Sequence, residues 1–284
     1  IVGGLVGAGI AAGGVKAISW SSVEKAAVGI VASPAVAIAV AFVAMYVIFG
    51  IQRLFKWHDN HPVFKGLQVV AAGALSFGHG ANDAQKTMGV VAALLLGAGY
   101  TTAGKGGAIT VPEWVALSAY GAIALGTLWG GWKIIETMGL KITTLHANSG
   151  AAANIGASTA IFGATALGAP ISTTHAAASS VVGAGVASGK GANWRVVGEM
   201  VLAWIFTVPA AAAIAFVVYW LTQMPTVLSW IAVGIVVVGF GIWVAWAVRH
   251  TVHAADVEAE IPSEEELDVL EPMGPHLRGG GPVE

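Results

Sequence analysis

The chain alternates long apolar runs with short polar interruptions, a pattern that predicts a series of membrane helices. An α-helix crosses the hydrocarbon core of a bilayer, about 30 Å thick, in about 20 residues. The apolar runs cover residues 1–12, 23–49, 67–77, 87–97, 113–138, 146–167, 174–188, 196–222 and 227–248. We therefore expect an all-α polytopic membrane protein, with the first run as the tail of a cut helix and Pro34 kinking the second.

The composition supports a membrane location and excludes several functional classes. Of the 284 residues, 56% are hydrophobic and 10% are charged, and the mean hydropathy is +0.78. Because soluble domains carry about 25% charged residues, a soluble core is a poor explanation. The formal net charge of −2 gives no reason to expect a nucleic-acid partner, and the lack of cysteine excludes disulfides and thiolate chemistry. We expect an integral, multi-pass protein of a prokaryotic cell membrane.

An internal repeat divides the chain. Residues 6–11 (VGAGIA) resemble residues 182–187 (VGAGVA) at an offset of 176, and a Trp and a Pro follow each copy in the same order. An odd number of expected crossings separates the copies, which favours the inverted repeat of secondary transporters. We expect residues 1–65 to be a remnant of the first repeat ending in a basic, cytoplasmic loop. Residues 66–249 would then hold the second repeat, and residues 250–284 an acidic, disordered tail.

The first polar interruption, residues 80–83 (Gly-Ala-Asn-Asp), lies between two apolar runs. An Asp near the middle of a membrane helix costs about 3 kcal/mol and is normally kept for a function. Because Gly78 and Gly80 lower helix propensity, we expect the helix to break here and line a cavity. Asn82 and Asp83 offer oxygen ligands for a small cation or a proton, and Lys86 could pair with Asp83. The alternative is a plain helix cap in which Lys86 only neutralises Asp83.

The second polar interruption follows Pro170 and consists of Ser172, Thr173, Thr174 and His175. Ser172 is a natural N-cap for the helix that follows. The start of a helix carries about half a positive charge and unpaired N–H groups, so the hydroxyls around it predict a site for a tetrahedral oxyanion. The alternatives are hydroxyls that bond their own backbone and, for His175, a buried structural role in place of anion binding or proton relay.

The pairing of the two interruptions predicts more than either does alone. One offers carboxylate and amide oxygens for a cation, and the other offers donors for an anion. A carrier that couples an anion to a cation needs both beside each other. The sequence thus predicts an inverted-repeat secondary transporter with broken or re-entrant helices.

Residues 80–89 (GANDAQKTMG) and 170–175 (PISTTH), with the glycines at 183 and 185, resemble the inorganic phosphate transporter (PiT) family. The similarity runs from the first residue to about residue 248. It implies two inverted repeats, each with an Asn-Asp and a Ser-Thr-Thr-His-like motif, and movement of inorganic phosphate with Na⁺ or H⁺. It also implies a lipid bilayer as surroundings and no cofactor besides the coupling ion, while a homo-oligomer stays open.

The resemblance places the transported ions on the matching residues. The expected phosphate contacts are Asn82, Ser172, Thr173, Thr174 and His175. The first four follow from the resemblance, and His175 is included because an imidazole can donate a hydrogen bond to an anion. For the coupling ion the expected contacts are Asn82, Asp83, Ser172 and Thr173, with Asp83 as the metal ligand if the ion is Na⁺. The chain departs from the family in carrying only the second Asn-Asp motif. The first Ser-Thr-Thr-His motif is expected just upstream of residue 1, so we expect the longer protein to transport, and not this chain alone.

Other functions stay open at this point. The cargo could be sulfate, arsenate or a metal–phosphate complex, because tetrahedral oxyanions share one geometry. An intramembrane enzyme could use Asp83 with His79 or His175, but the chain has no His-Glu-x-x-His pattern and no Cys. A non-transporting scaffold would gain nothing from the insertion cost of the polar clusters. We therefore expect a transporter and not an enzyme.

Overall fold

The computed structural model describes residues 1–102, 104 and 108–249, most of which are helical. The elements are α1 Val2–Gly13, η1 Val15–Ala17, α2 Trp20–Phe55, α3 Pro62–Gly97, α4 Glu113–Gly130, α5 Trp132–Glu136, the π-helical η3 Thr137–Lys141, α6 Ala147–Ala166, α7 Thr173–Ala187, α8 Trp194–Thr222 and α9 Thr226–Arg249. The predicted all-α architecture is confirmed. The predicted acidic tail, residues 250–284, lies outside the described residues.

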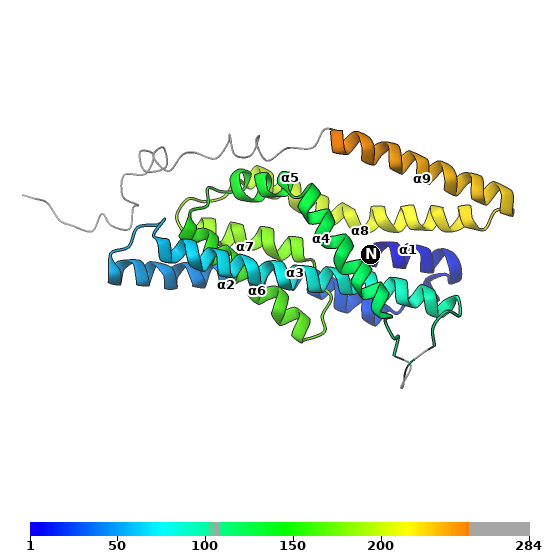
Figure 1. Ribbon diagram of the computed structural model, residues 1–284, viewed down its shortest axis with the longest axis horizontal. Helices are drawn as coiled ribbons and strands as arrows, with labels where there is room; N and C mark the ends of the chain where they lie inside the picture. Colours follow the sequence, from blue (N-terminus) through cyan, green and yellow to red (C-terminus); the bar gives the residue numbers. More distant parts are fainter. Residues whose placement is uncertain (103, 105–107, 250–284) are drawn as a thin grey trace, which may run out of the picture.

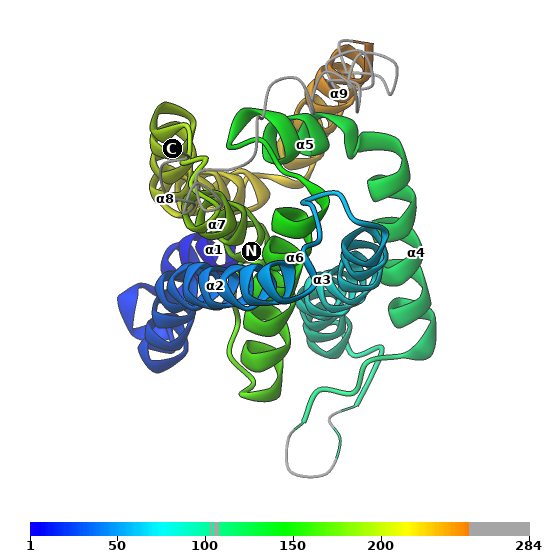
Figure 2. The same ribbon diagram turned by 90° about the vertical axis from the view of Figure 1, so that its left-hand side faces the viewer.

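The centre of the molecule is the α6–α7 pair. Figure 2 shows α6 between α2 and α3, with α4 on the outer side of α3, and α6 packs against both of its neighbours. Helix α7 packs against α2 and α6. In Figure 1, α8 lies between α9 and α1, and it contacts both. The two helices that carry mostly Ala, Gly and Ser are therefore the most enclosed.

Small side chains let these helices approach closely. Helix α2 buries a stripe at helical spacing that includes Ala37, Ala41 and Met45. A Cβ on Gly156 of α6 would lie 2.8 Å from the Ala37 carbonyl oxygen. Close backbone approach of this kind is typical of helix packing in membranes, where lipid provides no hydrophobic drive for helix association.

One packing arrangement occurs twice in the structure. The short, glycine-rich α1 packs on the long α8, and the short, glycine-rich α7 packs on the long α2. A Cβ on Gly7 would collide with the Ala212 carbonyl on α8, and one on Gly183 would lie 2.7 Å from the Ile38 carbonyl oxygen on α2. Gly7 and Gly183 are counterparts in the sequence repeat, which agrees with a repeated structural unit. Two points stay predictions: that the two copies run in opposite directions across the membrane, and that the boundary between the two repeats lies at residue 65.

The predicted helix break at residues 80–83 is wrong. Helix α3 runs without interruption from Pro62 to Gly97 and joins the runs 67–77 and 87–97 into one element. Gly78 serves packing, since a Cβ there would lie 3.2 Å from the Ile161 side chain of α6. A helix that satisfies its own backbone is strongly favoured in lipid, and this outweighs a propensity loss of about 1 kcal/mol at each glycine.

The single span expected over residues 113–138 is also wrong. Helix α4 ends at Gly130, the short α5 follows from Trp132, and a π-helical turn reaches Lys141. The apolar pattern continues through this region, but two consecutive glycines, Gly130 and Gly131, stand where α4 ends. The other predicted runs correspond to α1, α2, α6, α7, α8 and α9 within a few residues at most ends, and Pro34 and Pro209 lie inside α2 and α8.

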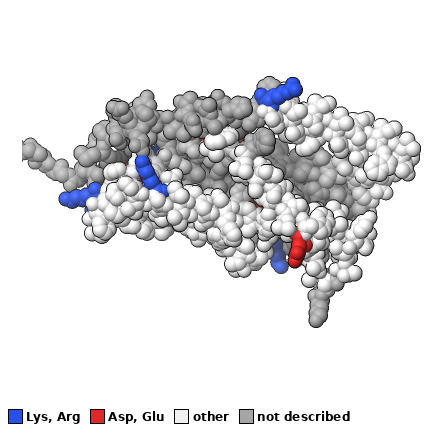
Figure 3. Space-filling model, in the orientation of Figure 1, with Lys and Arg blue, Asp and Glu red and all other residues white. Residues whose placement is uncertain are grey.

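The outer helices present apolar side chains to the surroundings. Within the part of the chain that the structure describes, three helices are long and apolar enough to cross a membrane, namely α2, α8 and α9. Neither α8 nor α9 contains a buried residue. Phe206 of α8 and Val227 of α9 are among their large exposed side chains. Figure 3 shows that charged side chains occupy only a few separate places among the described residues on the visible face. Such a surface fits lipid and not water.

The close contact between α7 and α2 leads to a stability prediction. Gly183→Ala should destabilise the protein by about 1–3 kcal/mol, the usual range for overpacking, because the Ile38 backbone must move. Gly73→Ala on α3 is the control, since a Cβ there meets nothing within 4 Å. The thermal midpoint of tryptophan fluorescence in detergent measures both. Equal midpoints for the two variants would contradict close packing at Gly183.

Candidate functional site

The N-terminus of α7 lies within the helical body. Helix α7 has 15 residues, so its length is about 22 Å, less than the thickness of a bilayer core. Ser172 caps it as predicted, and its side-chain oxygen accepts a hydrogen bond from the His175 backbone N–H at 3.4 Å. Thr173 is buried and Thr174 is exposed. The first-turn N–H groups and these hydroxyls are thus gathered at one point.

Asp83 links α3 to this helix start. The Thr173 hydroxyl lies 3.0 Å from Asp83 Oδ2 and 3.2 Å from Oδ1 and donates to the carboxylate. His79 Nε2 lies 3.0 Å from Oδ2, and Lys86 Nζ lies 2.9 Å from Oδ1. The two polar interruptions, which are 90 residues apart in the sequence, are therefore in direct contact, as their chemistry predicted.

Lys86 also reaches the loop before α7. Its Nζ donates to the Ile171 carbonyl oxygen at 2.6 Å as well as to Asp83. The predicted pairing of Lys86 with Asp83 is confirmed. The ammonium thus bridges a carboxylate on one helix and a backbone carbonyl next to the other.

A cavity of about 450 Å³ lies at this junction. Its polar lining includes Asp83, Lys86, Ser172, Thr173, Thr174, His175 and Thr207. Its other walls come from the start of α1, from α2 and from α8. The volume is ample for a tetrahedral oxyanion, and the lining combines a carboxylate with cationic and hydroxyl donors.

His175 packs against an aromatic side chain at the cavity wall. Its ring stacks on Trp204 of α8, with ring centroids 4.0 Å apart and an interplanar angle of 24°. Nδ1 of His175 is buried without a hydrogen-bond partner among the described residues. The stacking fixes the plane of the imidazole, and the cavity lies beside it.

Asn82 points away from the cavity. Its side-chain N–H donates to the Thr165 hydroxyl near the end of α6 at 3.2 Å, and Asn82 is not part of the cavity lining. Consecutive residues of an α-helix point about 100° apart, because there are 3.6 residues per turn. Asn82 and Asp83 therefore contact different helices, and an ion contact at Asn82 stays a prediction.

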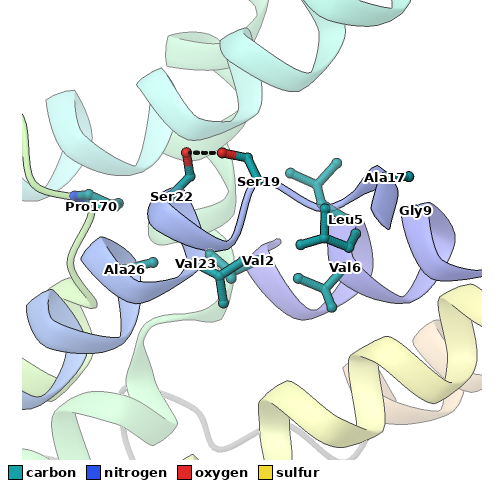
Figure 4. A pocket seen from close by; sticks show the side chains of 11 residues that line it. Val2, Leu5, Val6, Gly9, Ala17, Ser19, Ser22, Val23, Ala26 and Pro170 are labelled. Carbon is teal, nitrogen blue, oxygen red and sulfur yellow. Dashed lines mark hydrogen bonds between the residues drawn. The ribbon is translucent and has the colours of Figure 1, made fainter. Parts of the chain in front are cut away.

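A second cavity, of about 390 Å³, lies beside the first. Figure 4 shows its side chains, which are apolar except for Ser19 and Ser22, and these two hydroxyls bond each other at 3.0 Å. Val2, Ala26 and Pro170 line both cavities. This apolar lining is unsuited to an ion.

The family comparison covers the whole of this junction, because residues 1–215 match the model of the phosphate transporter family (PHO4). The chain belongs to the phosphate transporter family. The resemblance seen in the two motifs is therefore confirmed, and the family consists of transporters and not enzymes, which excludes the intramembrane enzyme. Membership and the membrane-compatible helices also confirm a multi-pass membrane protein of prokaryotic type.

Curated relatives extend this assignment. The chain is 42% identical over 228 residues to a probable low-affinity inorganic phosphate transporter of Rhizobium meliloti (strain 1021), covering 79% of this chain and 66% of the relative. It is 34% identical over 229 residues to a protein of the same name from Bacillus subtilis (strain 168), with 79% and 66% covered. The chain thus spans about two thirds of the length of these relatives.

A solved structure shares the fold of this phosphate transporter family member. It is named the sodium-dependent phosphate transporter and superposes with a TM-score of 0.66 at 25% sequence identity. The match covers 78% of this chain and 72% of that one. The described part of this chain contains no cluster of three or more His, Asp or Glu side chains that could hold a metal ion.

Sequence reasoning missed three contributors to the junction: the hydrogen-bonded contact of His79 with Asp83, the ring of Trp204 and the carbonyl of Ile171. His79 lies one turn before Asp83, at position i−4 of a continuous helix. The expected helix break at residues 80–83 would have separated His79 from Asp83, so this contact was not predicted. Trp204 comes from a segment that carries no motif, and the Ile171 carbonyl is a backbone group whose role residue type does not reveal. Only the tertiary fold brings the two to the cavity.

The cap of α7 gives a second stability prediction. Ser172→Ala should destabilise the protein by about 1 kcal/mol, because the His175 N–H loses its acceptor. Ser172→Asn should largely restore stability, since Asn caps helices as well as Ser does. Thermal midpoints in detergent measure both variants. A midpoint for Ser172→Ala equal to that of the unmodified protein would show that the hydroxyl does not cap α7.

Proposed function

We propose that the protein to which this chain belongs moves inorganic phosphate across the membrane together with a cation, Na⁺ or H⁺. The observation that carries the proposal is the contact between Asp83 and Thr173 at the wall of the 450 Å³ cavity. It joins a cation-binding group to the start of a helix that favours anions. The names of the relatives, low-affinity inorganic phosphate transporters, point to the same cargo.

Phosphate would bind at the start of α7. The N–H groups of its first turn have no intrahelical partners except where Ser172 accepts, and the helix dipole favours negative charge there. The exposed hydroxyl of Thr174 lines the cavity and can donate to a phosphate oxygen. His175, the next residue of α7, lines the same cavity and would add a further donor.

The cation would be held at Asp83. A carboxylate, the Thr173 hydroxyl and the Ile171 carbonyl offer the hard oxygen ligands that such ions prefer. Placing both ions at one junction makes the binding of each favour the other, since their charges are opposite. Alternating access would then move the site between the two sides of the membrane.

Removal of the Asp83 charge tests this function. Asp83→Asn in the full-length protein should abolish cation-dependent phosphate uptake, because the amide keeps the shape and loses the charge. Glu113→Gln at the exposed start of α4 is the matched control and should leave uptake unchanged. Uptake of radiolabelled phosphate into proteoliposomes measures both, with protein incorporation checked by immunoblot. Normal uptake by Asp83→Asn would refute the assignment.

The hydroxyls at the start of α7 give a second test. Thr174→Val should raise the half-saturating phosphate concentration about tenfold or more, because a hydrogen bond to a charged group contributes about 1.5–3 kcal/mol. Thr127→Val on α4 makes the same change far from the cavity and should have no effect. Competition by sulfate and arsenate in the same uptake assay separates phosphate from the other tetrahedral oxyanions. An unaltered concentration dependence for Thr174→Val would remove this hydroxyl from the substrate site.

A further inference from the structure

We propose that the ammonium group of Lys86 takes the place of a sodium ion beside Asp83, so that of the two coupling cations in the proposed function this protein uses H⁺ and not Na⁺. The inference rests on the proposed function and names the residue that decides its cation dependence. It differs from a role for Lys86 as a plain phosphate ligand, and the two lead to different results when sodium is varied.

The geometry around the Lys86 ammonium is that of a cation among oxygen ligands. Nζ lies 2.9 Å from Asp83 Oδ1 and 2.6 Å from the Ile171 carbonyl oxygen. The Thr173 hydroxyl completes the polar surroundings by binding the same carboxylate. Carboxylate, carbonyl and hydroxyl oxygens are the ligands that hard metal cations take. An ammonium can use the same oxygens as hydrogen-bond acceptors.

The local charge leaves no place for a sodium ion at Asp83. Of the described residues that line the cavity, Asp83 is the only one with a side-chain carboxylate and Lys86 the only Lys or Arg. Their charges cancel, so a sodium ion beside Asp83 would be repelled by the ammonium 2.9 Å from the carboxylate. The other partners of Asp83 are His79 and the Thr173 hydroxyl, and neither supplies a negative charge.

Because the Lys86 ammonium is covalently attached to α3, it competes strongly with sodium for the position beside the Asp83 carboxylate. Lys86 lies three residues after Asp83 on the unbroken helix α3, so the ammonium meets the carboxylate within a single turn of one helix. A sodium ion must instead be taken from solution and lose its hydration shell. An intramolecular partner acts at a high effective concentration, whatever the external sodium concentration is.

Phosphate uptake with sodium or choline as the external cation tests the inference in the full-length protein. The unmodified protein should transport at the same rate in both. Lys86→Gln, which removes the charge, should lose at least tenfold of its uptake in choline and recover it in sodium, because the ion can now occupy the vacated position. Lys86→Arg should keep the sodium independence. Lys25→Gln on α2, an exposed site with the same change of charge, should behave as the unmodified protein.

A binding measurement keeps the inference testable apart from transport. Sodium should raise the thermal midpoint of Lys86→Gln in detergent and leave that of the unmodified protein unchanged. A sodium requirement in the unmodified protein would overturn the inference. So would a Lys86→Gln protein that loses uptake equally in both cations and shows no sodium-dependent midpoint, which would make Lys86 a phosphate ligand. If the unmodified protein carries no phosphate in either cation, the proposed function fails, and the midpoints alone decide the role of Lys86.

Discussion

The hydrogen bonds between the Asp83 carboxylate and the Thr173 hydroxyl are the interaction on which the site depends. They join the middle of α3 to the first turn of α7. The carboxylate is only about one-third exposed, at 31%, and its oxygens are shared among Thr173, His79 and Lys86. A charge inside a membrane protein persists only when its surroundings repay the cost of removing it from water. The junction meets that condition with donors from two helices.

The rest of the fold places this junction inside the helical body. Helix α7 is too short to span a bilayer, and it is held against α2 by glycine contacts that permit backbone approach. Helix α6 fills the space between α2 and α3 with small side chains. The long α8 supplies Trp204, which closes the cavity on the side of His175. Helices α8 and α9 expose apolar side chains throughout, as lipid contact requires.

The sequence predicted the chemistry of the junction better than its backbone. Hydropathy identified most helices, because membrane helices must be long and apolar, and the cap at Ser172 followed from residue type alone. The pairing of Asp83 with Thr173 followed from complementary chemistry. The continuity of α3 did not, because glycine propensity is a local signal, whereas Gly78 is required by the distant Ile161. The direction of Asn82 toward Thr165 and the approach of Trp204 depend on tertiary placement, which no single segment encodes.

The divergent directions of Asn82 and Asp83 have a mechanical consequence. Thr165, bound by Asn82, lies just before the turn that links α6 to α7, and Thr173, bound by Asp83, lies just after it. Two adjacent residues of one rigid helix thus hydrogen-bond to both ends of the short segment that connects α6 to α7. Neither end of this connecting segment can move relative to α3 without breaking a hydrogen bond. Any displacement of this part of α3 along its axis would therefore move the whole connecting segment with it.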